Sequence, residues 1–227
     1  MNTYVVLPAH NEEKVIGDVL NDLSRQDVNI IVVDDGSDDD TSRIVNDFFS
    51  THPKINHLCT HPHNKGLGAA LNTGIQTALK NDADIIITFD SDGQHASDDI
   101  PRIIEPILEG KAEVVIGKRD FRKMPIKKRF GNAVMNLLTW IFYGIRVPDS
   151  QCGLRALSRK ASTAMELHKN DYGISSEIIR EIARCRMKVK FVPIQTIYTS
   201  YSSAKGTGFQ TGFAILADMF KDRFRSR

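Results

Sequence analysis

The sequence predicts an α/β protein built on a mostly parallel central sheet with helices on both faces. Short apolar runs rich in Val and Ile alternate with segments whose apolar residues recur at helical spacing. Strands of a parallel sheet are buried on both faces and have this continuous apolar character, and helical crossovers join them in parallel. Polar clusters follow several of the runs, at the edge where such sheets bind ligands. The chain of 227 residues, 41% of them hydrophobic, is long and apolar enough to bury a core rather than remain disordered.

The first βαβ unit has the clearest pattern. Residues 4–7 and 29–33 are apolar runs that we expect to form two buried strands. Apolar residues recur at helical spacing between them. Asn11 is the expected cap of this helix, with Glu12 and Glu13 in its first turn.

The same alternation continues along the chain. Further strands are expected at residues 55–60, 84–89 and 113–116, and another is expected to end at residues 192–194. Further helices are expected through residues 44–49, 67–79, 100–108, 130–145 and 209–227. The helix at 130–145 is apolar around most of its circumference, which predicts that it is buried under another element or lies against lipid.

The formal net charge of +2 is unevenly distributed. Residues 118–129 carry +6, residues 221–227 carry +3 and the remainder carries −7. Basic segments set against an acidic body indicate an anionic partner, such as phosphate groups or a membrane surface, although a solvated charged face explains them equally well. We expect one domain over residues 1–206 and a basic amphipathic helix over residues 207–227.

The sequence shows neither the pattern of a membrane-spanning helix nor that of a secretory signal. No stretch approaches the roughly 20 apolar residues that span a bilayer. The N-terminal residues lack the basic region and cleavage site of a secretory signal. We therefore expect a cytoplasmic protein that is peripheral at the inner face of the membrane, and we expect no nucleic-acid partner.

The strongest chemical signal is a pair of carboxylates, Asp90 and Asp92, directly after a hydrophobic run. At a strand end both can turn toward one divalent ion, and hard oxygen ligands suit Mg²⁺ or Mn²⁺. Gln94 could complete the ligand set. Such an ion would bridge the phosphates of a nucleoside diphosphate and offset charge on the leaving group. The alternative is a loop of acidic turn residues.

Two further polar clusters follow the first and second expected strands. Pro8 opens the sequence PAHNEE, and Asp35 lies in DDGS. Because Pro8, Asp35 and Asp90 each follow a parallel strand, they should converge on one crevice. There Asp35 or Glu12 can accept hydrogen bonds from a base or a ribose, although a turn and helix cap also explains DDGS.

A weaker signal is NKGLG at residues 64–68, whose backbone amides and Lys65 could face an anion because they precede a helix. Its spacing matches neither of the common nucleotide-binding glycine loops. His95 and His168 are expected to lie at the surface or to support other residues rather than to catalyse.

The chain contains, in this order, the motifs PAHNEE, VVDDGSDDDT, NKGLGAALNTG, FDSDGQH, GKR and DSQCGLR. Together they resemble the family-two inverting glycosyltransferases, and within them the dolichol-phosphate mannose synthases and other polyprenyl-phosphate sugar transferases, over about residues 3–206. The resemblance implies a GT-A fold, a nucleoside-diphosphate sugar donor and Mg²⁺ or Mn²⁺ held by Asp90, Asp92 and Gln94. It also implies six donor-binding positions: Pro8, His10, Glu12, Val33, Asp35 and Ser91.

The resemblance further implies an acceptor site. Arg119 and Arg129 match basic residues that hold the phosphate of a lipid acceptor, although both also belong to the basic face. Asp149 stands where related transferases place a carboxylate near the acceptor. One departure falls at residues 199–205, where the mannose synthases carry an Arg and this chain keeps only Lys205 as a donor-binding candidate. The nature of the sugar is therefore open.

The implied reaction moves a sugar from GDP-mannose or a UDP-sugar to a dolichyl or undecaprenyl phosphate at the membrane surface, with inversion. A phosphate acceptor is largely a dianion at neutral pH and needs little help from a base, so Asp149 is expected to orient rather than deprotonate. The alternatives are a glycan-elongating transferase with a sugar hydroxyl acceptor, which needs a base, and a catalytically silent membrane-associated subunit. Lys123, Lys127 and Lys128 are expected to serve only membrane docking, and a membrane-anchoring partner subunit remains an open alternative.

Overall fold

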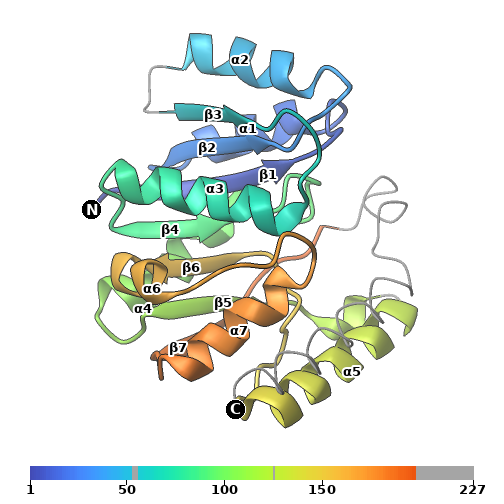
Figure 1. Cartoon of the computed structure of the whole chain (residues 1–227), viewed down its shortest axis with the longest axis vertical. Coiled ribbons are helices and arrows are strands. Elements are labelled where there is room, and N and C mark those ends of the chain that lie inside the picture. The colour runs from blue at the N-terminus through green and yellow to red at the C-terminus, as the bar shows by residue number, and fades with distance from the viewer. Residues whose placement is uncertain (53–55, 125, 198–227) are drawn as a thin grey trace.

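The computed structural model of the chain describes residues 1–52, 56–124 and 126–197, without the side chains of residues 123, 127 and 128. In this part of the chain a sheet has the strand order β3-β2-β1-β4-β6-β5-β7 (Figure 1). All strands run parallel except β6, which lies antiparallel between β4 and β5. The strands are β1 (Thr3–Ala9), β2 (Asn29–Asp34), β3 (Asn56–Thr60), β4 (Ile85–Thr88), β5 (Val114–Lys118), β6 (Arg155–Ser158) and β7 (Val189–Pro193). The predicted mostly parallel sheet is confirmed, but its pattern did not predict β6.

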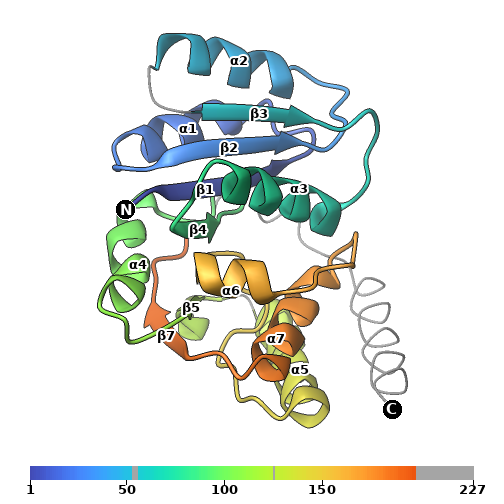
Figure 2. The same ribbon diagram turned by 60° about the vertical axis from the view of Figure 1, so that its left-hand side comes forward.

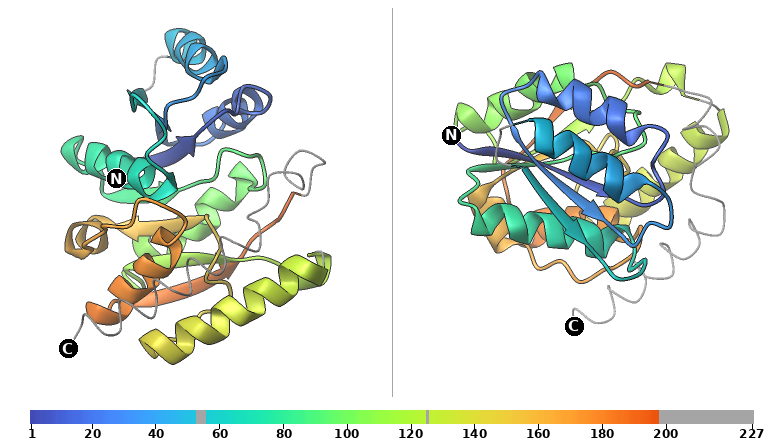
Figure 3. Two further views of the ribbon diagram at one scale, coloured as in Figure 1. Left: turned by 45° about the vertical axis from the view of Figure 1, so that its right-hand side comes forward. Right: turned by 90° about the horizontal axis from the view of Figure 1, so that it is seen from above.

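Helices cover both faces of this sheet, as predicted. They are α1 (Ile16–Ser24), α2 (Thr41–Thr51), α3 (Leu67–Lys80), α4 (Ile100–Leu108), α5 (Ile126–Tyr143), α6 (Arg159–Ala164) and α7 (Ile174–Arg184), with short 3-10 turns at Ser97–Asp99 and Phe121–Lys123. The ribbon views place α3, α6 and α7 on one face and α1 and α4 on the other (Figures 2 and 3). The core fills the space between these layers and the sheet, and Val5, Val6 and Leu7 of β1 are fully buried in it.

Helix α5 lies beside α7, away from the centre of the sheet (Figure 1). Its inner side carries the buried residues Asn132, Met135 and Thr139. Large apolar side chains, among them Phe130 and Leu137, are exposed along its outer side. The helix is therefore amphipathic in its packing even though its sequence is apolar nearly all round.

The expected cap of the first helix is wrong. Helix α1 begins at Ile16, and its N-cap, Val15, makes no side-chain capping hydrogen bond. Asn11 instead has a positive φ of 54°, and its side chain accepts a hydrogen bond from the amide of Asp38. Asn11 thus joins the loops that follow β1 and β2, because a short polar side chain tolerates the left-handed conformation of such a turn. The predicted helix at residues 207–227 lies outside the described residues.

Candidate active site

The carboxyl ends of β1, β2 and β4 meet at one edge of the sheet. Hydrogen bonds tie the loops after these strands together: the amide of Asp35 donates to Ala9 O at 2.8 Å, and the Ser91 hydroxyl donates to Pro8 O at 2.7 Å. The three strands pair in parallel and in direct succession. The expected convergence of these segments on one edge is confirmed, since parallel neighbours end on the same side.

Three of the predicted donor-binding residues have little side chain to offer a ligand. Pro8 and Val33 are buried strand residues, and Val33 belongs to the hydrophobic core. Ser91 is 5% exposed and its hydroxyl is engaged with Pro8 O. These residues shape the floor of the edge, so any contact that Pro8 or Val33 makes with a donor would come from the backbone.

Asp35 is buried and organises the loop after β3. One of its carboxylate oxygens accepts the amide of Lys65 at 2.9 Å and lies 2.6 Å from His61 Nδ1, and the other accepts the amide of Gly66 at 2.7 Å. The second ring nitrogen of His61 lies 2.9 Å from the Thr73 hydroxyl on α3. A nucleotide-sugar donor that contacts Asp35 would therefore meet a carboxylate whose orientation His61 already fixes. The sequence pattern did not identify His61 as part of the site.

The predicted anion-binding role of the NKGLG amides is wrong. The amides of Lys65 and Gly66 donate to the carboxylate of Asp35, and those of Gly68 and Ala69 donate to the carbonyl of Asn170. The protein itself supplies the acceptors that the N-terminus of a helix leaves open for a phosphate.

The two predicted donor-binding residues after β1, His10 and Glu12, lie in the loop that Asn11 connects by a hydrogen bond to the loop after β2. His10 is half-buried. Glu12 is buried, and its amide donates to the Thr41 hydroxyl at 2.8 Å. The amide of Asn11 donates to the Ser37 hydroxyl. Both residues thus stand at the same edge as Asp35, and their contact with a donor stays a prediction.

Asp90 and Asp92 lie in the turn that follows β4. His95 Nε2 is 3.0 Å from one oxygen of Asp90, and the His95 ring is buried against Phe89. Both the amide and the side-chain Nε2 of Gln94 donate to Asp92. The expectation that His95 supports other residues is confirmed, because it holds the first carboxylate of the pair.

The two carboxylates have opposite electrostatic settings. Burial raises the pKa of Asp90, but the hydrogen bond from His95 and the positive charges of Arg119 and Arg155 outweigh burial and leave this pKa below its ordinary value. Burial and the negative charge of Asp90 raise the pKa of Asp92, against the hydrogen bonds from Gln94. The second carboxylate therefore lies in a field that a cation would relieve.

The donor set fits a hard divalent ion. Asp90 and Asp92 supply oxygen ligands whose mutual repulsion raises the pKa of Asp92, and Mg²⁺ in proteins is commonly held by one or two carboxylates together with substrate phosphates. The described residues include no group of three or more His, Cys, Asp and Glu side chains that could hold a metal ion without a substrate. The side-chain amide of Gln94, whose Nε2 now donates to Asp92, would have to rotate and turn its oxygen toward the ion to act as the third ligand.

Gly153 leaves room for the carboxyl group of Asp90. A Cβ atom at this position would overlap both carboxylate oxygens of Asp90. The Thr88 hydroxyl donates to Gly153 O at 2.6 Å and fixes the backbone in this close approach. Gly153 therefore determines where the first carboxylate can stand.

We expect Gly153→Ala to lower kcat/KM about a hundredfold, because a displacement of about 1 Å at a reacting site can cost that much. Steady-state transfer assays at saturating metal would measure the loss. Gly131→Ala on α5 is the matched control, since a Cβ there meets nothing within 4 Å. Equal activities of the two variants would contradict this role of Gly153.

A second polar cluster surrounds Asp149, which is completely buried. Arg119 donates to it through Nε at 2.7 Å, through Nη2 at 2.8 Å and through its backbone amide at 3.2 Å. Asn132 Nδ2 on α5 adds a further hydrogen bond at 3.0 Å. Burial lowers the pKa of Arg119, but its hydrogen bonds and ion pair with Asp149 outweigh burial and raise it. Arg119 is thus a fixed cation, held from one side by a bidentate carboxylate.

Asp149 serves as a hydrogen-bond acceptor for Arg119 and Asn132, and its predicted orienting role stays a prediction. Its side-chain oxygens accept three hydrogen bonds from Arg119, two of them from the guanidinium, and one from Asn132. The pair uses Nε and Nη2 of Arg119 and does not involve Nη1, so this edge of the guanidinium can face another anion. Arg119 and Asp90 are close enough for their charges to interact, and each charge favours the ionised form of the other group.

A buried cation, Arg155, interacts electrostatically with both clusters. Its side chain is 1% exposed, and its Nη2 donates to Ser150 O at 3.0 Å. Burial lowers the pKa of Arg155, while the charges of Asp90 and Asp149 oppose that effect. The DSQCGLR motif contains Arg155, but only the fold shows that this arginine is buried and that the charges of Asp90 and Asp149 act on it.

The remaining predicted site residues are not brought into these clusters. Arg129 is exposed on α5, one turn before Asn132. Its role as an acceptor residue stays a prediction. Lys205 lies outside the described residues. Asn132 was not predicted, because its sequence neighbourhood is that of an apolar helix and nothing in it indicates a site.

Comparisons with known proteins find relatives that match most of the chain. The model of a protein family described as Glycosyl transferase family 2 matches residues 4–164. An uncharacterized protein of Methanocaldococcus jannaschii is 44% identical over 221 residues, which cover 94% of this chain and 88% of that protein. The UDP-N-acetylglucosamine–dolichyl-phosphate N-acetylglucosaminyltransferase of Methanococcus voltae is 39% identical over 231 residues, covering 93% and 92%. The polyprenol monophosphomannose synthase of Mycolicibacterium smegmatis is 27% identical over 178 residues, covering 74% and 66%.

Among solved structures, a likeness is found with glucosyl-3-phosphoglycerate synthase from Mycobacterium tuberculosis in complex with Mn²⁺, UDP and glucosyl-3-phosphoglycerate. The TM-score is 0.77 at 20% sequence identity, over 98% of this chain and 79% of that chain. At this identity the likeness shows the fold alone, and it confirms the predicted GT-A architecture.

Proposed function

Because this chain belongs to glycosyl transferase family 2, we propose that it transfers a sugar from a nucleoside-diphosphate sugar to the phosphate of a polyprenyl phosphate. The observation that carries this proposal is the Arg119–Asp149 pair. The pair fixes a cation whose charge interacts with Asp90, so an anionic acceptor held by Arg119 would lie near the carboxylates that are proposed to bind the donor. The dolichyl-phosphate and polyprenol transferases among the relatives act on acceptors of this chemistry.

The occupied carboxylate of Asp149 favours a phosphate acceptor over a sugar hydroxyl. A hydroxyl nucleophile must lose a proton to a positioned base. Both carboxylate oxygens of Asp149 already accept hydrogen bonds from Arg119 and Asn132, and Asp149 is completely buried, so its oxygens are directed at these donors rather than at an acceptor hydroxyl. A phosphomonoester is largely a dianion at neutral pH and can attack without that help.

The chemistry follows from these positions. An oxygen of the acceptor phosphate attacks the anomeric carbon of the sugar and forms the new C–O bond, while the C–O bond to the diphosphate breaks and its electron pair leaves with the nucleoside diphosphate. Configuration inverts because attack and departure occur on opposite faces, and no proton needs to move. Arg119 holds the acceptor phosphate, and Asp149 and Asn132 orient Arg119.

The donor would be held on the other side of the edge. Asp35 with its loop faces the nucleoside, and Asp90, Asp92 and Gln94 would hold a divalent ion. Such an ion, when bound, neutralises the charge that develops on the diphosphate. Among donors, UDP-N-acetylglucosamine is the first candidate because the relative that is 39% identical uses it, and GDP-mannose is the next.

The proposal is tested by incubating the protein with UDP-sugars and GDP-mannose, Mg²⁺ or Mn²⁺, and a short polyprenyl phosphate. We expect a glycosyl phosphate lipid, identified by mass, together with free nucleoside diphosphate. An oligosaccharide acceptor is assayed in parallel. Transfer to the oligosaccharide alone would contradict the phosphate acceptor, and no product with any donor would contradict the function as a whole.

We further propose that the outer side of α5 rests on an anionic bilayer. Ile126, Phe130, Leu137 and Ile141 are exposed along this side, while Asn132 on the inner side holds Asp149. The segment 118–129, which leads into the helix, carries +6, and each Lys or Arg near an anionic bilayer contributes about 1 kcal/mol. The same helix would thus place the acceptor site at the lipid surface. Within the described residues no helix is long and apolar enough to cross a membrane.

Leu137→Glu should weaken binding to liposomes containing anionic lipid about tenfold and reduce transfer to a long-chain acceptor in those liposomes. A carboxylate loses apolar insertion and adds repulsion from the surface. Transfer to a short, detergent-soluble acceptor should be unchanged. Leu108→Glu on α4 is the matched control, because Leu108 is 49% exposed and Leu137 is 50% exposed. Equal effects of the two substitutions on liposome binding would contradict docking through α5.

A further inference from the structure

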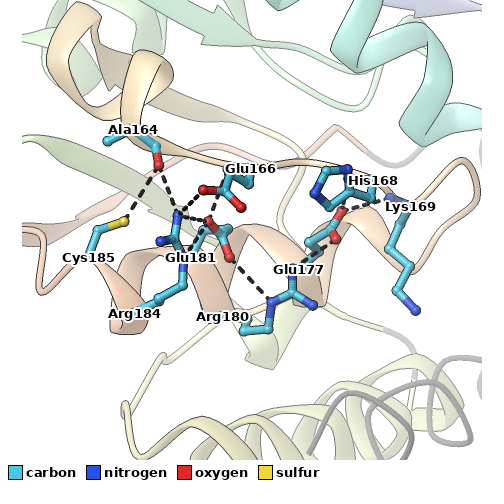
Figure 4. Close-up of polar contacts among 9 residues, drawn as sticks. All are labelled: Ala164, Glu166, His168, Lys169, Glu177, Arg180, Glu181, Arg184 and Cys185. Atoms are coloured by element: carbon cyan, nitrogen blue, oxygen red, sulfur yellow. Dashed lines mark hydrogen bonds and ion pairs between the residues drawn. The ribbon is translucent and has the colours of Figure 1, made fainter. Parts of the chain in front are cut away.

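Two buried glutamates lie one turn apart on α7 (Figure 4). Glu177 and Glu181 are each 1% exposed, and both pair with Arg180, which lies 3.0 Å from Glu177 and 3.3 Å from Glu181. A buried carboxylate is costly unless ion pairs and hydrogen bonds compensate its lost hydration. The hydrogen bonds that the second oxygen of each glutamate accepts therefore indicate why the carboxylate is buried there.

The second oxygens hold the backbone of the segment 166–170, which runs past α7 (Figure 4). Oε2 of Glu177 accepts the amides of His168 at 2.9 Å and Lys169 at 2.8 Å. Oε2 of Glu181 accepts the amide of Glu166 at 3.0 Å and is also bonded to Arg184. The two glutamates are thus equally buried and both pair with Arg180, but they bind the backbone of the segment 166–170 at different residues.

The segment in turn caps α3. The carbonyl of Asn170, the residue after Lys169, accepts the amides of Gly68 at 2.8 Å and Ala69 at 3.2 Å. The approach is so close that a Cβ at position 66 or 68 would overlap the carbonyl of Asn170 or Lys169. The first turn of α3 can therefore hold its place only while residues 169–170 hold theirs.

The start of α3 continues directly into the loop that fixes Asp35. The amides of Lys65 and Gly66 donate to the two oxygens of the Asp35 carboxylate at 2.9 and 2.7 Å. Gly66 has a φ of 98°, a conformation that side chains rarely adopt. A series of hydrogen bonds thus runs from Glu177 through residues 168–170 and the first turn of α3 to Asp35. The contact of Glu181 with this segment is at Glu166, which precedes the series.

We propose that Glu177 is a positioning residue for donor binding, acting through residues 168–170 on the loop that orients Asp35. The inference rests on the proposed function, in which Asp35 and its loop face the nucleoside of the donor. It adds a residue from the distant helix α7 to the determinants of donor affinity.

The test compares Glu177→Gln with Glu181→Gln in the full chain. A glutamine keeps one acceptor oxygen and turns an N–H₂ group toward the donors that the other oxygen had satisfied. Both variants lose the carboxylate charge beside Arg180. A difference between the two variants in donor KM or amide exchange therefore reports which part of the segment 166–170 has lost its hydrogen bonds. Donor KM, acceptor KM and kcat are measured, together with amide hydrogen exchange of residues 65–69 in the protein without nucleotide.

We expect Glu177→Gln to raise the donor KM about tenfold, equivalent to about 1.4 kcal/mol, with acceptor KM and kcat within about twofold of wild type. Exchange at residues 65–69 should become faster. Glu181→Gln should leave donor KM and this exchange as in wild type. Unchanged exchange in Glu177→Gln, or the same change in both variants, would overturn the series of contacts.

Faster exchange with an unchanged donor KM would overturn the role in donor binding. The proposed function is tested separately by the wild-type chain. If wild type uses no nucleoside-diphosphate sugar, the donor role falls with the proposed function, and the exchange data still decide whether Glu177 controls the loop.

Discussion

Asp92→Asn is expected to abolish sugar transfer, lowering kcat about a thousandfold, because half of the carboxylate pair that would hold the divalent ion is lost. Stabilisation of charge by a metal ion amounts to several kcal/mol, and each 1.36 kcal/mol is tenfold in rate. Binding of a nucleoside diphosphate in the presence of Mn²⁺ should weaken in the same variant. The transfer assay and calorimetric titration of Mn²⁺ with nucleoside diphosphate measure these two effects.

The same substitution should not lower Tm. Burial and the charge of Asp90 raise the pKa of Asp92, so ionising this group costs more free energy in the folded protein than in the unfolded chain. A neutral amide removes that penalty, which means that lost activity cannot be attributed to lost folding. Asp98→Asn is the matched control, since Asp98 is an exposed carboxylate whose Oδ1 accepts a hydrogen bond from Gln26. Wild-type turnover of Asp92→Asn would disprove the metal assignment.

The second large effect is expected at the Arg119–Asp149 pair. Asp149→Leu leaves the guanidinium of Arg119, whose side chain is only 17% exposed, without its partner. Removing one member of a buried pair destabilises a protein by about 3–5 kcal/mol, whereas replacing both with apolar residues is often neutral. The double variant Arg119→Met/Asp149→Leu should therefore regain much of the stability that the single variant loses, as measured by urea unfolding.

Activity should separate from stability in this pair of variants. Transfer should be lost in the single variant and stay lost in the double variant, because Arg119 is proposed to hold the acceptor phosphate. Asn132 keeps its place on α5 in both, but it carries no charge that could replace the guanidinium. A stable double variant with wild-type activity would remove Arg119 from the acceptor site. A double variant no more stable than the single one would contradict the compensation between the two buried charges.

Much of the fold could be predicted because its signals are local. The Ile-rich run before Asp90 and the helix Ile100–Leu108 follow from side-chain periodicity over a few residues. The antiparallel strand β6 was missed, because a strand of four residues that follows a polar motif has too little pattern to be recognised. Its position between β4 and β5 is fixed by pairing with both neighbours.

The candidate site divides in the same way. The pair Asp90 and Asp92 could be predicted from the sequence, because both follow a recognisable strand and the carboxyl ends of parallel strands form the binding edge of the sheet. The expectation that the backbone amides at the NKGLG loop bind an anionic ligand failed for residues 65, 66, 68 and 69, because Asp35 and Asn170 accept their hydrogen bonds and neither is a sequence neighbour. A role for the Lys65 side chain stays a prediction.

The amino-acid pattern alone was enough to predict the α/β class, the parallel order of the first strands and the carboxylates at their ends, since each depends on residues adjacent in the chain. The hydrogen bonds of Asp149 with Arg119 and Asn132, and the contacts from Glu177 through residues 168–170 to the loop of Asp35, became visible only in the folded protein. The physical reason is that a buried charge is tolerated only where packing brings donors to it. In this protein those donors come from elements that are distant in sequence and meet only when the chain has folded.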